Sequence, residues 1–185
     1  MAYKGQIMNC PQTGETFEFV ETSEMTGGKH VRLKVTLLPG SLQPVMHLHE
    51  SGDEIFEVIA GKLTYRLDGR QGVIGPGEKI LLPKGVPHTH YNAENEPLVV
   101  FQTVAPALDF EVFIENFCGL LNDGKFSKGQ PPFLQVMVWI QTLKTKTFLA
   151  SIPVGVQKTL ACLLTPAALV AGYRKSYPKY SGLQK

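Results

Sequence analysis

The chain has 185 residues, of which 43% are apolar, and this is enough for one compact domain with or without an appendage. Lysine and arginine (18) exceed aspartate and glutamate (16) by two, and these charges are scattered instead of forming a basic stripe. Nucleic acid is therefore not expected as a partner.

Residues from about 15 to 105 form short runs of alternating apolar and polar side chains, separated by Gly, Pro, Asn and Asp. The run at residues 31–37 ends at Pro39-Gly40 and is typical of a strand with one buried face. Further strands are expected at residues 45–49, 54–59, 63–67, 79–82, 87–91 and 98–104. About seven antiparallel strands favour a barrel or jelly roll, because such a set must close or stack to remove its edges.

Helical periodicity replaces this alternation after Pro106 and predicts a helix over residues 109–121. Apolar residues at helical spacing predict an amphipathic helix over residues 133–143. Another helix is expected from after Pro153 to about Gly172, with a kink or a break at Pro166. These patterns divide the chain into a β-barrel domain at residues 1–106 and an α-helical extension at residues 107–185. The extension is expected to pack on the barrel or on a dimer partner.

The cysteines and the chain ends predict a cytoplasmic location. Cys10, Cys118 and Cys162 lie far apart without a CxxC pair, which indicates neither a disulfide framework nor a zinc knuckle. The first 28 residues lack the apolar core of a secretory signal. The longest apolar stretches are shorter than the roughly 20 residues that span a bilayer, so no membrane span is predicted. Weak association of the basic-flanked C-terminal helices with a membrane surface stays open.

Two blocks of sequence contain four of the five histidines and predict a metal site. His47 and His49 are two residues apart, so on a strand both side chains point to the same face and can share one ion. Glu54 follows after the flexible Ser51-Gly52, and His88 comes from a later strand. Three imidazoles and one carboxylate suit one divalent ion of Fe, Mn, Ni, Cu or Zn and leave coordination positions open. Glu50 and Asp53 flank this set, but the spacing favours Glu54 as the ligand.

These blocks resemble the two signature motifs of the cupin superfamily over roughly residues 29–105. The first motif is matched by Gly40, His47, His49, Glu54 and Gly61, and the second by Gly77, Pro83, Gly85, His88 and Asn92. The one departure is six residues, instead of five, between Gly40 and His47. The resemblance implies a mainly β fold, a double-stranded β-helix or jelly-roll barrel, here with an α-helical C-terminal extension. It places the metal ligands on His47, His49, Glu54 and His88.

Other residues of the barrel are candidates for the catalytic and substrate-binding roles. His90 has the strand parity of His88 and is either a catalytic acid or base or a packing histidine. The candidate substrate contacts are Phe56, Tyr65, Tyr91 and Gln102.

The resemblance implies dioxygenase-like oxidoreductase or isomerase chemistry on a small polar organic molecule, in a protein expected to be a homodimer. The alternative is a non-catalytic cupin that binds or senses a small ligand. Fold alone does not choose between them.

Overall fold

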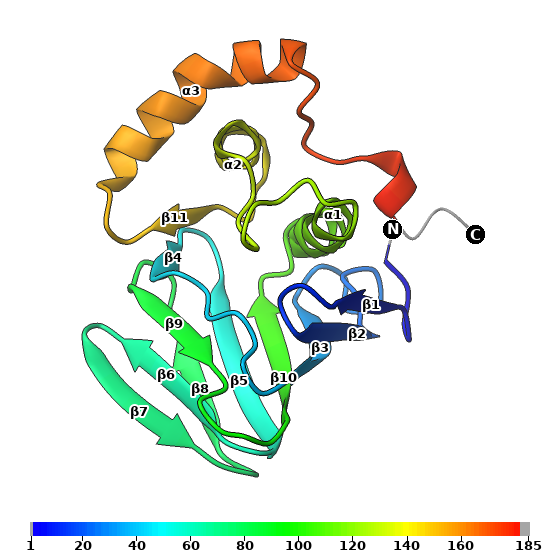
Figure 1. Ribbon diagram of the computed structural model, residues 1–185, viewed down its shortest axis with the longest axis vertical. Helices are drawn as coiled ribbons and strands as arrows, with labels where there is room; N and C mark the ends of the chain where they lie inside the picture. Colours follow the sequence, from blue (N-terminus) through cyan, green and yellow to red (C-terminus); the bar gives the residue numbers. More distant parts are fainter. Residues whose placement is uncertain (1, 182–185) are drawn as a thin grey trace.

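Two antiparallel β-sheets face each other as a jelly roll, and three helices lie over one end of it (Figure 1). The structure is a computed structural model that describes residues 2–181; residue 1 and the last part of the predicted extension, residues 182–185, lie outside it. The six-stranded sheet has the order β1 (Ile7–Cys10), β2 (Glu15–Glu21), β3 (Val31–Leu37), β10 (Leu98–Ala105), β5 (Asp53–Ala60) and β8 (Lys79–Leu82). The five-stranded sheet has the order β11 (Thr147–Leu149), β4 (His47–His49), β9 (His88–Tyr91), β6 (Leu63–Leu67) and β7 (Arg70–Ile74).

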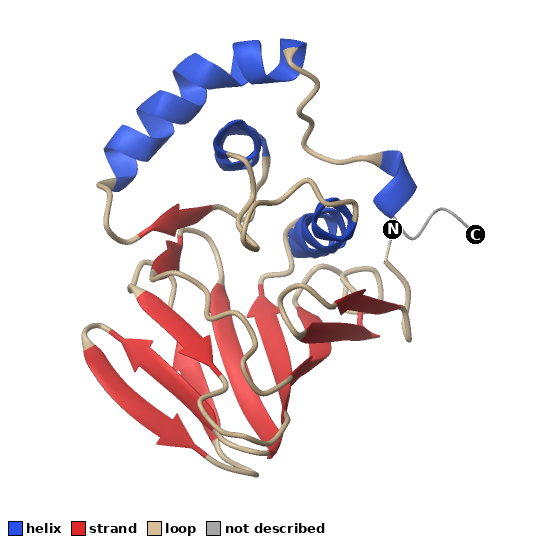
Figure 2. Ribbon diagram, viewed as in Figure 1, coloured by secondary structure: helices blue, strands red, loops and turns tan. Residues whose placement is uncertain are grey.

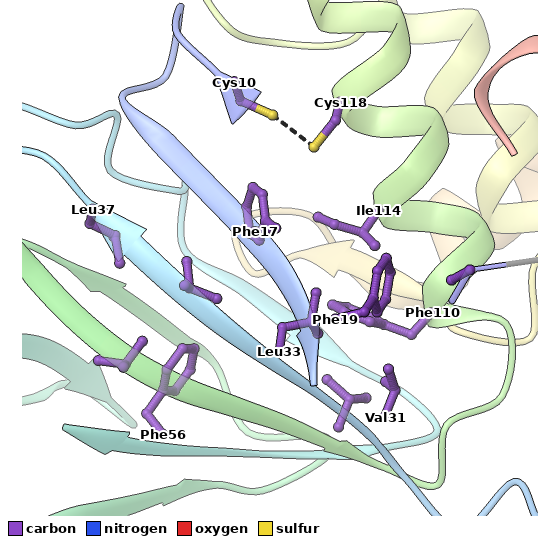
Figure 3. Close-up of a cluster of buried hydrophobic side chains, with 14 of the residues drawn as sticks. Cys10, Phe17, Phe19, Val31, Leu33, Leu37, Phe56, Phe110, Ile114 and Cys118 are labelled. Carbon is purple, nitrogen blue, oxygen red and sulfur yellow. Dashed lines mark hydrogen bonds between the residues drawn. The ribbon is translucent and has the colours of Figure 1, made fainter. Parts of the chain in front are cut away.

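The core of the barrel comes from the inward faces of alternating strands. Every second residue of β3, from Val31 to Leu37, is buried, and β10 pairs with it in the same alternation. Side chains from β2, β3 and β5 meet those of the first helix in one cluster (Figure 3). Burial of this apolar surface is the main force that closes the sheets on each other. The strands that the sequence predicts therefore lie where their alternation requires.

Tight turns join neighbouring strands at the positions that glycine marks in the sequence. Between β6 and β7 the chain turns through Asp68 and Gly69, both with positive φ (48° and 76°), as a two-residue hairpin of the type I′ kind requires. Gly61, between β5 and β6, has φ 80°, and a Cβ there would lie 2.7 Å from the carbonyl oxygen of Pro97. A larger residue here would collide with the backbone of the chain just before β10 and displace the turn.

Helices make up most of the C-terminal part and form a separate layer in Figure 2. They are α1 (Phe110–Asn122), α2 (Phe133–Thr142), α3 (Val154–Val170) and a single 3-10 turn, η1 (Pro178–Tyr180). α1 buries Phe110, Ile114 and Cys118 against the barrel, as i, i+4 spacing on one helix face dictates. α2 packs on α3, and α3 continues through Pro166 without a break. No helix within residues 2–181 is long and apolar enough to cross a membrane.

Two cysteines connect the N-terminal strand with the first helix. The Cys10 Sγ donates a hydrogen bond to the Cys118 Sγ at 2.7 Å, and both side chains are buried (Figure 3). The hydrogen bond with Cys10, together with burial, raises the pKa of the Cys118 thiol well above its ordinary value. Cys118 therefore stays a protonated, packed thiol, and Cys162 on α3 is the exposed cysteine.

Sequence patterns do not predict the short strand β11, nor the strands β1, β2 and β7. β11 lies inside the predicted helical extension and pairs antiparallel with β4, with Thr147 opposite His49 and Leu149 opposite His47. Phe148 between them is almost fully buried with Met137 and Ala161 from α2 and α3. The extension thus contributes an edge strand to the barrel, directly beside the strand that carries two of the predicted metal ligands (Figure 1).

Candidate metal centre

The four predicted ligands come together between the two sheets. His47 and His49 lie on β4 and His88 on β9, where His47 and His88 are register partners. Glu54 approaches from β5 in the opposite sheet. One donor atom of each residue lies within 4.8 Å of those of the other three. This spacing suits four ligands around a single ion, each about 2.0–2.2 Å from it.

Each of the three histidines has its Nδ1 atom held by another group. The Nδ1 of His47 lies 2.7 Å from the carbonyl oxygen of Val45, and that of His88 lies 2.9 Å from the carbonyl oxygen of Val86. Because a carbonyl only accepts, these two rings carry their proton on Nδ1 and present the bare Nε2 to the cluster. The Nδ1 of His49 lies 3.0 Å from the hydroxyl oxygen of Thr147 on β11.

Glu54 is a buried carboxylate with one oxygen engaged and one free. Its Oε1 accepts a hydrogen bond of 2.5 Å from the Nε2 of Gln102 on β10. Its Oε2 lies 3.7 Å from His49 Nε2 and 3.5 Å from His88 Nε2, and among the described residues neither Glu54 Oε2 nor His88 Nε2 has a hydrogen-bond partner. A buried atom without a partner is costly. Two such atoms facing each other fit a site for a cation.

The protonation states of the cluster also suit a cation. Burial alone would raise the pKa of Glu54, but the rings of His49 and His88 bring it well below the ordinary value, so it stays ionised. Burial, followed by the nearby His49, lowers the pKa of His47 to about 3 and keeps it neutral. Burial also lowers the pKa of His88, but the Glu54 carboxylate and the Val86 carbonyl outweigh it and raise the value. Metal ligands must be deprotonated. A cation at this site therefore competes with a proton on His88, which the Glu54 carboxylate stabilises.

His90 and Phe56 lie next to this cluster. Their rings are 4.3 Å apart between centroids, and His90 lines the cavity described below. Burial lowers the pKa of His90 to about 4, so its imidazole is neutral at physiological pH. The neutral ring can take up a proton, but a pKa this far below physiological pH makes it a weak base. A catalytic role for His90 stays a prediction.

The remaining candidates lie around the site in different ways. Gln102 lines the cavity, whereas the Tyr65 ring lies over Gly72 on the neighbouring strand and Tyr91 is paired with Thr64 in the ladder. Neither tyrosine is among the described residues that line the cavity, and contact of either with a substrate stays a prediction.

The acidic residues that flank the ligands have other partners. Glu50 forms an ion pair with Lys158 on α3, and Asp53 accepts a hydrogen bond of 2.9 Å from the backbone N–H of Lys84. Neither belongs to the cluster of four. Asn92, the last residue of the second motif, donates to the carbonyl oxygens of Leu37 and Glu96 and so secures a turn.

A cavity of about 460 Å³ extends from the metal cluster to the helices. His47, His49 and Glu54 belong to its lining, and α1, α2, β11 and α3 supply much of the rest. The volume is within the range of about 300–1,000 Å³ that small-molecule sites have. Sequence reasoning missed this helical wall, because nothing in the two motifs indicates which apolar helix face covers the barrel mouth.

Thr147 is a functional candidate that sequence reasoning missed, and it yields a prediction. Replacing Thr147 by valine keeps the shape but removes the oxygen that faces His49 Nδ1. We expect metal affinity to fall about 10- to 100-fold, as for other partners that orient ligand histidines. Calorimetric titration with Zn²⁺ measures this, with Thr103→Val on the outer face of β10 as the matched control. Equal affinities in the two variants would show that Thr147 does not orient His49.

Glu15 is a second acidic residue of the cavity, outside the metal cluster. Burial raises its pKa from 4.5 to about 7, and a hydrogen bond with Thr13 opposes the rise. Between these two values the folded protein keeps a proton that the unfolded chain loses. The free energy of unfolding therefore decreases as the pH rises through this window, by at most about 3 kcal/mol, and this contribution is constant above it.

We expect Glu15→Gln to remove this pH dependence, because an amide does not titrate in this window. Urea unfolding of both proteins at about pH 5 and about pH 8 measures it. The free energy of unfolding of the variant, minus that of the unsubstituted protein, should be more positive at pH 8 than at pH 5. Glu18→Gln, on the same strand but with a side chain that is partly exposed, should change stability little and equally at both values. A Glu15→Gln effect that is independent of pH contradicts the prediction.

Comparisons with known proteins agree with this fold. A protein-family model described as "Cupin domain" matches residues 33–104. A solved RmlC-like cupin from Shewanella frigidimarina is 16% identical, with a TM-score of 0.50 over 60% of this chain and 93% of that one. No curated protein matches the chain significantly.

Two further solved structures resemble it more weakly. A predicted oxalate decarboxylase from Thermotoga maritima is 22% identical, with a TM-score of 0.47 over 50% of this chain and 80% of that one. A putative sugar phosphate isomerase from Acidithiobacillus ferrooxidans is 22% identical, with a TM-score of 0.44 over 56% of this chain and 68% of that one. With both motifs in place on a jelly roll, residues 33–104 are a cupin domain.

Proposed function

We propose that this protein is a metal-dependent enzyme, with one divalent transition-metal ion held by His47, His49, Glu54 and His88. Its reaction is dioxygenase-like oxidoreductase chemistry or an isomerisation. The observation that carries the proposal is the pair of buried, unpartnered donor atoms, Glu54 Oε2 and His88 Nε2, in a cluster of four ligands whose other side opens into a cavity. A purely structural polar cluster would satisfy its own hydrogen bonds.

The residues around the ion have separable tasks. When bound, a divalent ion in this donor set polarises an oxygen of the substrate as a Lewis acid. Gln102 and Thr147 fix the orientations of Glu54 and His49 through hydrogen bonds. His90, buried and neutral, is the candidate that accepts a proton from the substrate. The helices over the cavity keep bulk water away from the reacting atoms.

Metal analysis tests the proposal first. Protein purified without added metal should contain about one equivalent of Fe, Mn, Ni, Cu or Zn, and His49→Ala should contain almost none. Oxygen consumption or isomerisation by the loaded protein, measured on oxygen-bearing organic compounds, then identifies the reaction. Turnover that is unchanged in His49→Ala would reject a metal-dependent mechanism.

A non-catalytic binding or sensing protein is the second candidate, favoured by the extent to which helices cover the cavity. In that case a ligand would copurify with the protein and remain unchanged after metal loading and exposure to oxygen. Mass spectrometry of the extracted ligand, before and after incubation, separates the two candidates.

We also propose that the protein is a cytoplasmic homodimer. Several apolar side chains of α3 are exposed, among them Leu163 (69%) and Val170 (91%), and a partner subunit would cover them. Light scattering on the purified protein measures the mass, and Leu163→Glu should shift it toward the monomer.

A further inference from the structure

The wall of the cavity opposite the metal cluster is apolar. Among the described residues, α1 contributes side chains such as Phe113 and Phe117, and α2 contributes Val136 and Trp139. None of the lining side chains from α1 and α2 is charged. The one N–H group among them, on Trp139, donates to the carbonyl oxygen of Lys175 at 3.2 Å and is not offered to a ligand.

Several polar side chains of the lining outside the metal cluster already form hydrogen bonds within the protein, among them Thr13, Gln102 and Thr147. The amide of Gln157 on α3 is used by the backbone of Leu149 and Ile152. Burial raises the pKa of Glu15 to about 7, so this carboxyl is largely protonated in slightly acidic solution. A molecule with several charged or hydroxyl groups would find few free partners here and would lose hydrogen bonds to water.

The mouth of the cavity is also apolar. Five apolar residues both line the cavity and reach the surface: Val45 (48% exposed), Phe133 (58%), Leu149 (37%), Ile152 (37%) and Leu160 (37%). They belong to the loop before β4, to α2, to β11, to the connection after it, and to α3. Exposed apolar side chains gathered around an opening are typical of a binding site for an apolar molecule.

We propose that the substrate is amphipathic: one oxygen-bearing head at the metal cluster and an extended apolar body along α1 and α2. This inference rests on the proposed function, since the head is the group that the ion polarises. It departs from the small polar molecule that the sequence suggests, because the helical wall belongs to the extension and not to the motifs. The polar ligands His47, His49 and Glu54 meet the head, and the apolar wall meets the rest.

Binding of straight-chain carboxylates to the full, Zn²⁺-loaded chain tests this substrate class. Trp139, the single tryptophan of the chain, lines the cavity, so its fluorescence reports occupancy. We expect octanoate to bind about 80- to 250-fold more tightly than butanoate, because it has four more CH₂ groups and each buried CH₂ group strengthens binding about three- to fourfold. Equal affinities for the two chain lengths would overturn the proposal.

Two variants and one control locate the apolar body. Val136→Phe fills part of the cavity and should weaken the binding of dodecanoate, while the affinity for butanoate stays unchanged. The control is Leu134→Phe, because Leu134 lies on the same helix but outside the lining. Leu160→Gln, at the exposed mouth, should weaken dodecanoate even if the filled variant does not fold. Dodecanoate affinity that is unchanged in both folded variants rejects this location.

The metal arm of the experiment separates this inference from the proposed function. With Zn²⁺ bound, removal of the carboxylate head, as in 1-octanol, should weaken binding; without metal, the two octyl compounds should bind similarly. If affinity follows chain length but not the metal, the metal-centred function is wrong and the apolar site remains. If Zn²⁺ binds and short and long chains bind equally, the substrate class is wrong and the metal centre remains.

Discussion

Replacement of His88 by alanine is expected to reduce metal affinity by more than about 100-fold, beyond the 10- to 100-fold typical of a lost partner of a ligand. His88 is fully buried, and its Nε2 faces the free oxygen of Glu54. The variant also leaves that carboxylate without its neighbour, at a cost to folding of the metal-free protein. Calorimetry with Zn²⁺ measures the affinity, and circular dichroism verifies the fold.

A second readout of the same prediction is thermal stability. Because a metal that binds only the folded state raises Tm, excess Zn²⁺ should stabilise the unsubstituted protein and have little effect on His88→Ala. His30→Ala is the matched control, because His30 is paired with Glu21 on the surface and lies outside the cluster. Excess Zn²⁺ should raise the Tm of this variant as it does for the unsubstituted protein. A similar rise in Tm for His88→Ala and His30→Ala would remove His88 from the ligand set.

Replacement of Phe148 by alanine is expected to lower the free energy of unfolding by about 3–5 kcal/mol. The ring is 1% exposed, packs with Met137, Ile140 and Ala161, and holds β11 between the barrel and the helices. The loss leaves a cavity that the surrounding helices fill only in part. Urea unfolding of the metal-free protein measures the change directly.

The neighbouring residue gives the control for this prediction. Leu149 is on the same strand but 37% exposed, so Leu149→Ala should cost less than about 1 kcal/mol. Phe148→Ala should also weaken Zn²⁺ binding, since Thr147 and β4 lose the support of a packed strand. Equal destabilisation by the two substitutions would mean that Phe148 does not secure β11.

Period-two alternation predicted strands such as β3, β5 and β10 well, because each of them has one buried face. It did not single out β1, β2 and β7. The strands over residues 63–67 and 79–82 agree with β6 and β8 residue for residue. The clustering of the four predicted ligands followed from the motif spacing. Two histidines two residues apart on one strand point to the same face, and the loop before the carboxylate is short. α1 and α2 likewise began within one residue of the predicted positions.

Other features depend on long-range packing that local patterns do not encode. β11 has three residues, and its partner strand lies about a hundred positions earlier, so no local periodicity marks it. The role of Thr147 follows from that pairing and not from its own neighbours. The sequence predicted a kink or a break at Pro166, and the break does not occur: α3 is continuous through this residue. Packing of α3 on α2 holds the helix together despite the proline.

The pairing of β11 with β4 also governs the order in which the protein can be completed during synthesis. All four proposed ligands lie before residue 89, but the strand that covers the open edge of β4 is made only after residue 146. Until then the nascent barrel exposes an unpaired edge and an uncovered apolar interior, the features that make partly made β-proteins prone to aggregate. The edge of β4 can therefore be covered only when the chain is nearly complete, and His47 and His49 lie on that strand.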